Sequence, residues 1–100
     1  MADLRNEATD ALFKAILSLK DEAECYAFFE DLCTVGELQA MSQRYHVARL
    51  LRSGLVYSEV GRISGASSAT ISRVNRCLQY GSGGYRVVLE REEQNSGETE

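Results

Sequence analysis

The chain contains no proline among its 100 residues, and this absence constrains the fold more than any other feature of the sequence. Proline interrupts the hydrogen-bond ladder of an α-helix, so a chain without it can form helices along its whole length. Apolar residues recur at helical spacing near the start of the chain, at Leu4, Ala8, Leu12, Ile16 and Leu19. Alternation of apolar and polar residues, which would indicate strands, does not persist long enough to build a sheet. The sequence therefore predicts an all-α fold that begins with a helix over residues 4–19.

Local signals mark where the next two helices begin and end. Asp21 is a typical N-cap residue, because its carboxylate can accept a hydrogen bond from a free backbone N–H of the first turn. Thr34 and Glu37 have the spacing of a capping box, in which each side chain binds the other residue's backbone N–H. Gly54 suits the left-handed position that follows the end of a helix. We expect one helix after Asp21 and a long helix from Thr34 to about Ser53.

The C-terminal part of the sequence changes in character after residue 80. The segment Gly81-Ser82-Gly83-Gly84 is a flexible joint, and the residues from Tyr85 to Glu92 predict a short final helix. Residues 93–100 offer no apolar anchor, so we expect a disordered tail there. Because about 100 residues suffice for one domain, we expect residues 1–92 to form a single helical domain.

Several classes of protein are disfavoured by the sequence. There is no run of about 18 apolar residues that could span a membrane, and the N-terminus lacks the apolar region of a secretory signal, so we expect a cytoplasmic protein. Cys25, Cys33 and Cys77 have no C-x-x-C spacing, and we expect buried thiols rather than metal ligands. His46 is the sole histidine and is expected at the surface or at a dimer interface. We see no base and nucleophile that would make this chain an enzyme.

The charge of the chain is unevenly distributed. The net charge is −4, but residues 38–79 contain six arginines and a single acidic residue, Glu59, which gives this segment a charge of +5. A local basic segment in an acidic protein is compatible with nucleic-acid binding, because the field of the phosphates acts over a short range. Arginine also suits bidentate contacts to phosphate or guanine better than lysine does. On charge alone, a solvated helix face explains the segment equally well.

The residues from Tyr57 to Arg76 have the pattern of two short helices around a turn. Gly61 is small enough for the position where the two helices cross, Gly65 tolerates the backbone conformation of the turn, and Ser67 is a natural N-cap for the second helix. Apolar residues at helical spacing are expected to join the two helices: Val60, Ile63, Ala66, Ile71 and Val74. This pattern predicts a helix-turn-helix over about residues 57–78.

If Ile71 and Val74 face inward, small polar side chains and arginines of the second helix face outward. Such a surface lets the start of a recognition helix enter the major groove of double-stranded DNA, which is about 12 Å wide. The candidate DNA-binding residues are Arg62, Ser67, Ser68, Ala69, Thr70, Ser72, Arg73 and Arg76. The alternative is a helical hairpin that packs in a small bundle, which would make the chain a protein-interaction adaptor that never binds DNA.

The segment from Gly65 to Arg73 resembles the helix-turn-helix of the Trp repressor superfamily. Three further stretches resemble its TrpR-like YerC/YecD branch: Glu37–Arg44, Leu50–Arg52 and Arg73–Tyr85. The resemblance covers about residues 4–92 and implies about six helices, an intertwined homodimer and a DNA-binding transcription regulator that acts as a repressor. It also implies that the two recognition helices of the dimer occupy successive major grooves.

The resemblance further implies a small-molecule corepressor held between two arginines, which match Arg44 and Arg73 here. Two departures argue against tryptophan as that molecule. Aligning both Arg44 and Arg52 with the repressor pattern requires a length change of one residue within the helix that carries them. One residue rotates a side chain by about 100° around the helix axis. In addition, Val74 stands where the repressors have glycine and could fill the space of an indole. The identity of an effector, and its existence, are left open by the sequence.

A homodimer is also expected on physical grounds. Two recognition helices read two half-sites only when they lie about 34 Å apart, one turn of the duplex. The N-terminal part contains more large apolar side chains than so short a chain can bury. They are Leu4, Leu12, Ile16, Leu19, Phe28, Phe29, Leu32 and Leu38.

Overall fold

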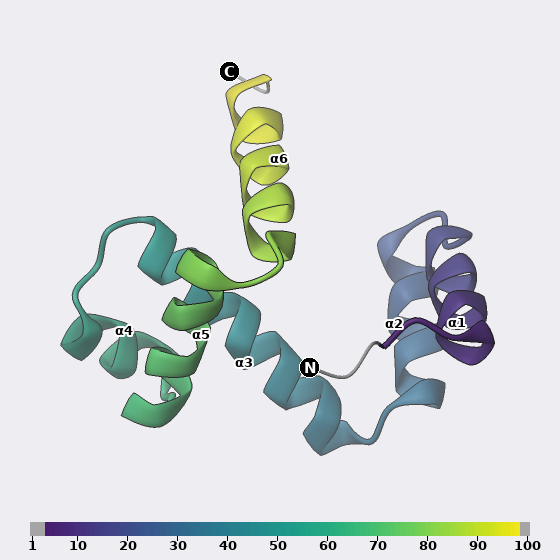
Figure 1. Cartoon of the computed structure of the whole chain (residues 1–100), viewed down its shortest axis with the longest axis horizontal. Coiled ribbons are helices and arrows are strands. Elements are labelled where there is room, and N and C mark those ends of the chain that lie inside the picture. Colours follow the sequence, from purple (N-terminus) through teal and green to yellow (C-terminus); the bar gives the residue numbers. More distant parts are fainter. Residues whose placement is uncertain (1–3, 99–100) are drawn as a thin grey trace. The chain divides into compact units, whose positions relative to one another are not determined.

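The computed structural model describes residues 4–98, which form six helices and no strand (Figure 1). The helices are α1 (Glu7–Leu17), α2 (Glu22–Leu32), α3 (Val35–Arg52), α4 (Tyr57–Ser64), α5 (Ser68–Tyr80) and α6 (Gly84–Glu98). The predicted all-α class is confirmed. None of the helices within the described residues is both long and apolar enough to cross a membrane.

Side-chain caps begin the helices where the sequence predicts them. Asp21 accepts a hydrogen bond of 2.8 Å from the backbone N–H of Glu24. Thr34 and Glu37 form the reciprocal capping box, with distances of 3.1 and 2.8 Å. The first helix is shorter than residues 4–19, because Asn6 caps it by accepting a hydrogen bond of 2.8 Å from the backbone N–H of Thr9. Short-range capping thus sets the start of each of these three helices.

The chain divides into two compact units, Met1–Leu38 and Gln39–Glu100. In the first unit, α1 and α2 contain no buried residue within one chain. Leu4 and Leu17 are 77% and 83% exposed, and Phe28 contacts Phe29 edge to face, with ring centroids 5.7 Å apart. The apolar face of this unit is therefore uncovered in the single chain. One domain over residues 1–92 stays a prediction.

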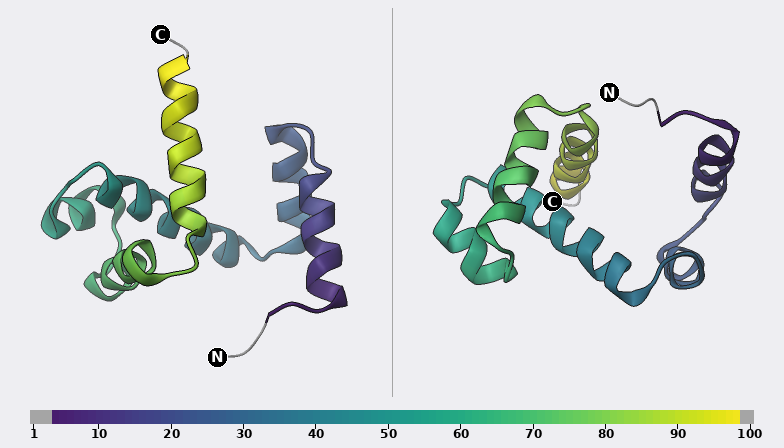
Figure 2. Two further views of the ribbon diagram at one scale, coloured as in Figure 1. Left: turned by 45° about the horizontal axis from the view of Figure 1, so that its top comes forward. Right: turned by 60° about the horizontal axis from the view of Figure 1, so that its bottom comes forward.

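The second unit has its own core at the contact of four helices. In both views of Figure 2, α4 and α5 lie beside the C-terminal half of α3. The buried side chains come from α3, α4, α5 and α6, and they are Val47, Ala48, Val60, Ile71, Val74 and Leu89. This core fixes the positions of α4 and α5, the two helices of the predicted helix-turn-helix.

Two expectations about individual side chains were wrong. Ile63, expected in the joint between α4 and α5, is 42% exposed. The inner face of α4 passes through Val60, Gly61 and Ser64, and the helical spacing turns Ile63 away from that face. The cysteines are not buried in the single chain either, since Cys25 and Cys77 are exposed and Cys33 is half-buried.

The last helix is longer than expected. We predicted a disordered tail from residue 93, but α6 continues as helix through Glu98. That prediction was wrong for residues 93–98, and residues 99 and 100 lie outside the described part of the chain. The reason is that polar contacts hold α6 beyond its last buried apolar residue, Leu89: Glu92 and Glu93 form ion pairs with arginines of α3.

Candidate nucleic-acid interface

The turn between α4 and α5 has a defined geometry. Gly65 ends α4 in the left-handed region, with φ of 72°, and its N–H donates to the carbonyl of Gly61 at 2.9 Å. The hydroxyl of Ser64 donates to the carbonyl of Val60 at 2.6 Å and accepts from the backbone N–H of Ala66 at 3.1 Å. These contacts satisfy backbone groups at the end of α4 and so hold the turn in one conformation.

Gly61 lies where α4 meets α5, as predicted, but the two helices do not approach each other unusually closely at this position. A Cβ atom at this position would lie 3.6 Å from the Cδ1 atom of Ile71 and 3.7 Å from the carbonyl oxygen of Ala66. These are ordinary van der Waals distances. The crossing therefore accepts a small residue such as alanine and does not require glycine.

Ser67 caps the N-terminus of α5. Its hydroxyl accepts a hydrogen bond of 3.2 Å from the backbone N–H of Thr70 and lies 3.1 Å from the hydroxyl of Thr70. Ile71 and Val74 of the same helix are 2% and 1% exposed, so they face the core. The helix thereby turns its other side to solvent. Thr70 is half-buried, and the remaining α5 candidates and the cap residue are exposed: Ser67, Ser68, Ala69, Ser72, Arg73 and Arg76.

The arginines of the basic segment fall into two groups. Arg62 donates from Nε and Nη2 to both carboxylate oxygens of Glu59, each at 2.8 Å. This contact lowers the pKa of Glu59 and raises that of Arg62. On α3, Arg49 Nε lies 2.8 Å from Glu92, and Arg52 Nε lies 3.1 Å from Glu93. Half of the predicted basic segment is thus neutralised by carboxylates.

The other three arginines have no such partner. Among the residues whose side chains the structure describes, Arg44, Arg73 and Arg76 have no carboxylate oxygen within 4.0 Å. Arg73 and Arg76 lie on α5 and are exposed, whereas Arg44 lies on α3 and is half-buried. The uncompensated charge of the helix-turn-helix is therefore on its second helix.

The predicted effector site at Arg44 and Arg73 involves α3 and α5. Val74, which we expected to fill the space of a bound indole, is buried among the core residues of the second unit. Its side chain is directed into that core and away from the exposed surface that carries Arg73. An effector site at Arg44 and Arg73 stays a prediction.

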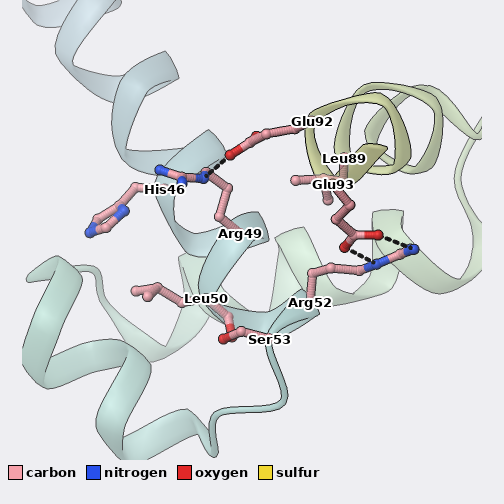
Figure 3. Close-up of a pocket in the computed structure, with 8 residues that line it drawn as sticks. All are labelled: His46, Arg49, Leu50, Arg52, Ser53, Leu89, Glu92 and Glu93. Carbon is pink, nitrogen blue, oxygen red and sulfur yellow. Dashed lines mark hydrogen bonds and ion pairs between the residues drawn. The ribbon is translucent and has the colours of Figure 1, made fainter. Parts of the chain in front are cut away.

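The sequence reasoning missed a polar cluster between α3 and α6 (Figure 3). The hydroxyl of Tyr45 donates to Glu92 at 2.6 Å, and Arg52 binds both oxygens of Glu93. Burial of the ring and the contact with Glu92 raise the pKa of Tyr45 to about 12. A cavity of about 420 Å³ adjoins this cluster, lined by His46, Arg49, Leu50, Arg52, Ser53, Leu89, Glu92 and Glu93. The sequence did contain a signal for this cluster. Arg49 and Arg52 lie three residues apart on one helix, and the adjacent Glu92 and Glu93 on the last helix could have been predicted to pair with them.

Comparison with known proteins places the chain in a family. The family model of the Trp repressor protein matches residues 7–93. The uncharacterized protein YerC of Bacillus subtilis (strain 168) is 51% identical over 96 residues, which cover 96% of this chain and 92% of YerC.

Two solved structures share the fold. The crystal structure of a protein described as a candidate Trp repressor from Staphylococcus aureus has a TM-score of 0.87 and 51% identity, and the match covers 90% of each chain. That of a TrpR-like protein from Eubacterium eligens has a TM-score of 0.87 and 52% identity, covering 90% of this chain and 93% of the other. The chain therefore belongs to the Trp repressor family.

Proposed function

We propose that this protein is a sequence-specific DNA-binding transcription regulator, a repressor, that acts in the cytoplasm as a homodimer. The observation that carries the proposal is the outward surface of α5, where short side chains at the start of the helix are followed by the unpaired Arg73 and Arg76. Membership of the Trp repressor family supports a regulator rather than an enzyme.

In this proposal α5 is the recognition helix. Ser68, Ala69 and Ser72 are small and exposed, so the N-terminal half of the helix can approach the base edges of a major groove closely. The partial positive charge of the helix N-terminus favours a nearby phosphate. Arg73 and Arg76 then bind phosphates or a guanine edge, while Ser67 and Thr70 line the groove at the start of the helix.

Arg62 takes a secondary role in the proposal. Its guanidinium already binds both oxygens of Glu59, so a phosphate must displace that carboxylate before Arg62 can contribute. The pair is exposed to solvent, and exposed ion pairs contribute little to stability, so a phosphate can compete with Glu59 for Arg62.

The dimer in this proposal covers the N-terminal unit. Within one chain α1 and α2 bury no residue, and large side chains such as Phe13 and Tyr26 are 56% and 58% exposed. Monomeric proteins rarely expose large continuous apolar patches, because their removal from water yields about 25 cal/mol per Å². A second copy of the chain supplies a partner that is always present, and it places a second recognition helix on the same duplex.

The proposal is tested by measuring duplex binding of Arg73→Ala and Arg76→Ala across a range of salt concentrations. Genomic fragments selected by the wild-type protein supply the duplex. Each variant is expected to weaken binding and to reduce the slope of log affinity against log salt by about 1, because one phosphate contact is lost. Arg91→Ala is the control, since Arg91 is an exposed arginine on α6, outside the helix-turn-helix. Unchanged affinity and slope in both α5 variants would overturn the assignment.

A second candidate is a protein-interaction adaptor that does not bind DNA. The net charge of −4 and the neutralisation of Arg49, Arg52 and Arg62 by carboxylates favour it. Retention of the wild-type protein on duplex DNA or heparin at low salt supports the regulator, whereas its appearance in the flow-through supports the adaptor.

A further inference from the structure

We propose that Ala69 of α5 selects a thymine, through contact between its methyl side chain and the 5-methyl group of that base in the major groove. This inference rests on the proposed function, because it requires that α5 be a recognition helix. It goes further in assigning the choice of one base to one residue.

Ala69 lies at the centre of the outward side of α5. The inward side of this helix consists of Ile71 and Val74, which are buried, and Leu78, which is half-buried and packs against the same core. Successive residues of an α-helix are rotated by about 100°, so Ala69 lies opposite the middle of this apolar row. Arg76, about two turns later, points in nearly the same direction, and both residues are exposed. The side of α5 that is turned away from the core therefore begins with a methyl group.

The neighbours of Ala69 allow its methyl group to reach the bases. Ser68 and Ser72 flank it on the exposed surface, and both are too short to hold the helix away from the floor of a groove. Ser67 caps the helix by accepting a hydrogen bond of 3.2 Å from the backbone N–H of Thr70, and Thr70 itself is half-buried. Ala69 is thus the apolar side chain that meets the base edges first.

The chemistry of the major groove decides which base complements this methyl group. The base edges present hydrogen-bond donors and acceptors there, and the 5-methyl group of thymine is the apolar substituent among them. A methyl group that is pressed against a donor or an acceptor displaces its water without replacing the hydrogen bond, which costs free energy. Contact between two methyl groups instead removes apolar surface of both from water. Ala69 therefore favours thymine over the other bases.

The other side chains at the start of α5 leave this choice to Ala69. Serine hydroxyls both donate and accept, so they discriminate weakly between bases, and arginine binds guanine or phosphate. Adenine and cytosine are read by amide and carboxylate side chains, and residues 68–74 contain neither. Asn75 and Gln79 come later in the helix, where Nε2 of Gln79 donates to Oδ1 of Asn75 at 3.4 Å. The first half of α5 is therefore suited to thymine through Ala69 and to guanine through Arg73.

The test replaces the thymines of a duplex selected by the wild-type protein with uracil, one position at a time. Uracil differs from thymine only in lacking the 5-methyl group. At the thymine that faces Ala69, the loss of one methyl contact should weaken binding about 4-fold. Substitution by 5-bromouracil at the same position should restore the affinity, because bromine fills nearly the volume of the methyl group.

Two glycine variants assign the contact to a residue. Ala69→Gly removes the methyl group of the protein, so it should bind the thymine and uracil duplexes alike. Ser72→Gly changes an exposed neighbour in the same helix and should keep the preference for thymine. Each preference is a ratio measured on one protein, so a smaller folded fraction in a variant cancels.

Cross-linking provides a measurement on the unmodified protein. Ultraviolet irradiation of the complex with the 5-bromouracil duplex should attach the DNA to the tryptic peptide of residues 63–73, which contains Ala69. The proposal is overturned if no uracil weakens wild-type binding, if Ala69→Gly keeps the preference for thymine, if Ser72→Gly loses it, or if the cross-link lies in another peptide. Failure of the wild-type protein to bind any duplex would overturn the proposed function as well, whereas duplex binding that is insensitive to uracil would overturn this inference alone.

Discussion

The hydroxyl of Tyr45 on α3 donates a hydrogen bond of 2.6 Å to Glu92 on α6, a residue 47 positions later in the chain. The other oxygen of the same carboxylate lies 2.8 Å from Nε of Arg49. One glutamate thus connects two residues of α3 to α6, one turn beyond Leu89, the last buried apolar residue of that helix. The second half of α6 is held to α3 by polar contacts rather than by an apolar face.

Tyr45→Phe should change the pH dependence of stability in the alkaline range. In the folded chain, burial and Glu92 raise the pKa of Tyr45 to about 12, whereas an unfolded tyrosine ionises near 10. The folded state holds the proton of Tyr45 more strongly than the unfolded state does, so the protonated tyrosine stabilises the fold. This contribution to the free energy of unfolding is fully present below pH 10 and is lost as the pH rises through 12. Urea unfolding of Tyr45→Phe should therefore show a smaller decline in the free energy of unfolding above pH 10.

At neutral pH the free energy of unfolding of the same variant should be lower by about 1.5–3 kcal/mol, because the hydrogen bond to the charged carboxylate of Glu92 is absent. Tyr80→Phe is the control, since the side chain of Tyr80 is 82% exposed. An identical alkaline decline in wild type and Tyr45→Phe would contradict the role assigned to the contact between Tyr45 and Glu92.

Gly65→Ala and Gly61→Ala should change stability in opposite directions. Gly65 has φ of 72°, and an alanine in this left-handed conformation costs about 1–2 kcal/mol. Gly61 lies within α4, where an added Cβ meets only ordinary contacts, and alanine is favoured over glycine in a helix by up to about 1 kcal/mol. Thermal and urea unfolding of the two variants provides the measurement. Equal destabilisation by both would show that the crossing of α4 and α5 is tighter than the structure indicates.

The melting temperature should rise with protein concentration. If the exposed apolar face of α1 and α2 is covered by a second copy, folding and association are linked, and mass action favours the folded dimer at high concentration. Leu17→Ser removes an apolar side chain that is 83% exposed in the single chain, so it should lower the melting temperature only through the dimer. Light scattering that gives an 11.1 kDa particle, with melting independent of concentration, would contradict the dimer.

Glu59→Gln should strengthen duplex binding if the proposed DNA interface is correct. The substitution removes the carboxylate charge that holds Arg62, so the guanidinium becomes available to a phosphate. The slope of log affinity against log salt should then become steeper by about 1. The double variant Glu59→Gln, Arg62→Ala should lose this gain. Glu90→Gln, which removes an exposed carboxylate of α6 instead, should leave binding unchanged, and this separates a contact of Arg62 from a general loss of negative charge. A gain that persists in the double variant would exclude Arg62 as a phosphate ligand.

The amino-acid sequence by itself determined the local structure of this protein. The caps at Asp21, Thr34 and Ser67 and the left-handed turn at Gly65 are where the sequence predicted them. Each of these depends on hydrogen bonds between residues no more than four positions apart or on the backbone of one residue, so neighbouring residues suffice to specify it. The same holds for the outward direction of Arg73 and Arg76 once Ile71 and Val74 are assigned to the core.

Only the tertiary structure decided which charged and apolar side chains remain without a partner at the surface. Arg49 and Arg52 belong to the basic segment in the sequence, yet Glu92 and Glu93 of α6 neutralise them, with Arg52 and Glu93 separated by 41 positions. Ile63 fits the apolar spacing of α4 but lies outside the face that α5 covers. Helical period restricts which residues share a face, but the rotation of each helix against its neighbours depends on packing among distant segments. That packing left α5, and no other part of the helix-turn-helix, with unpaired arginines.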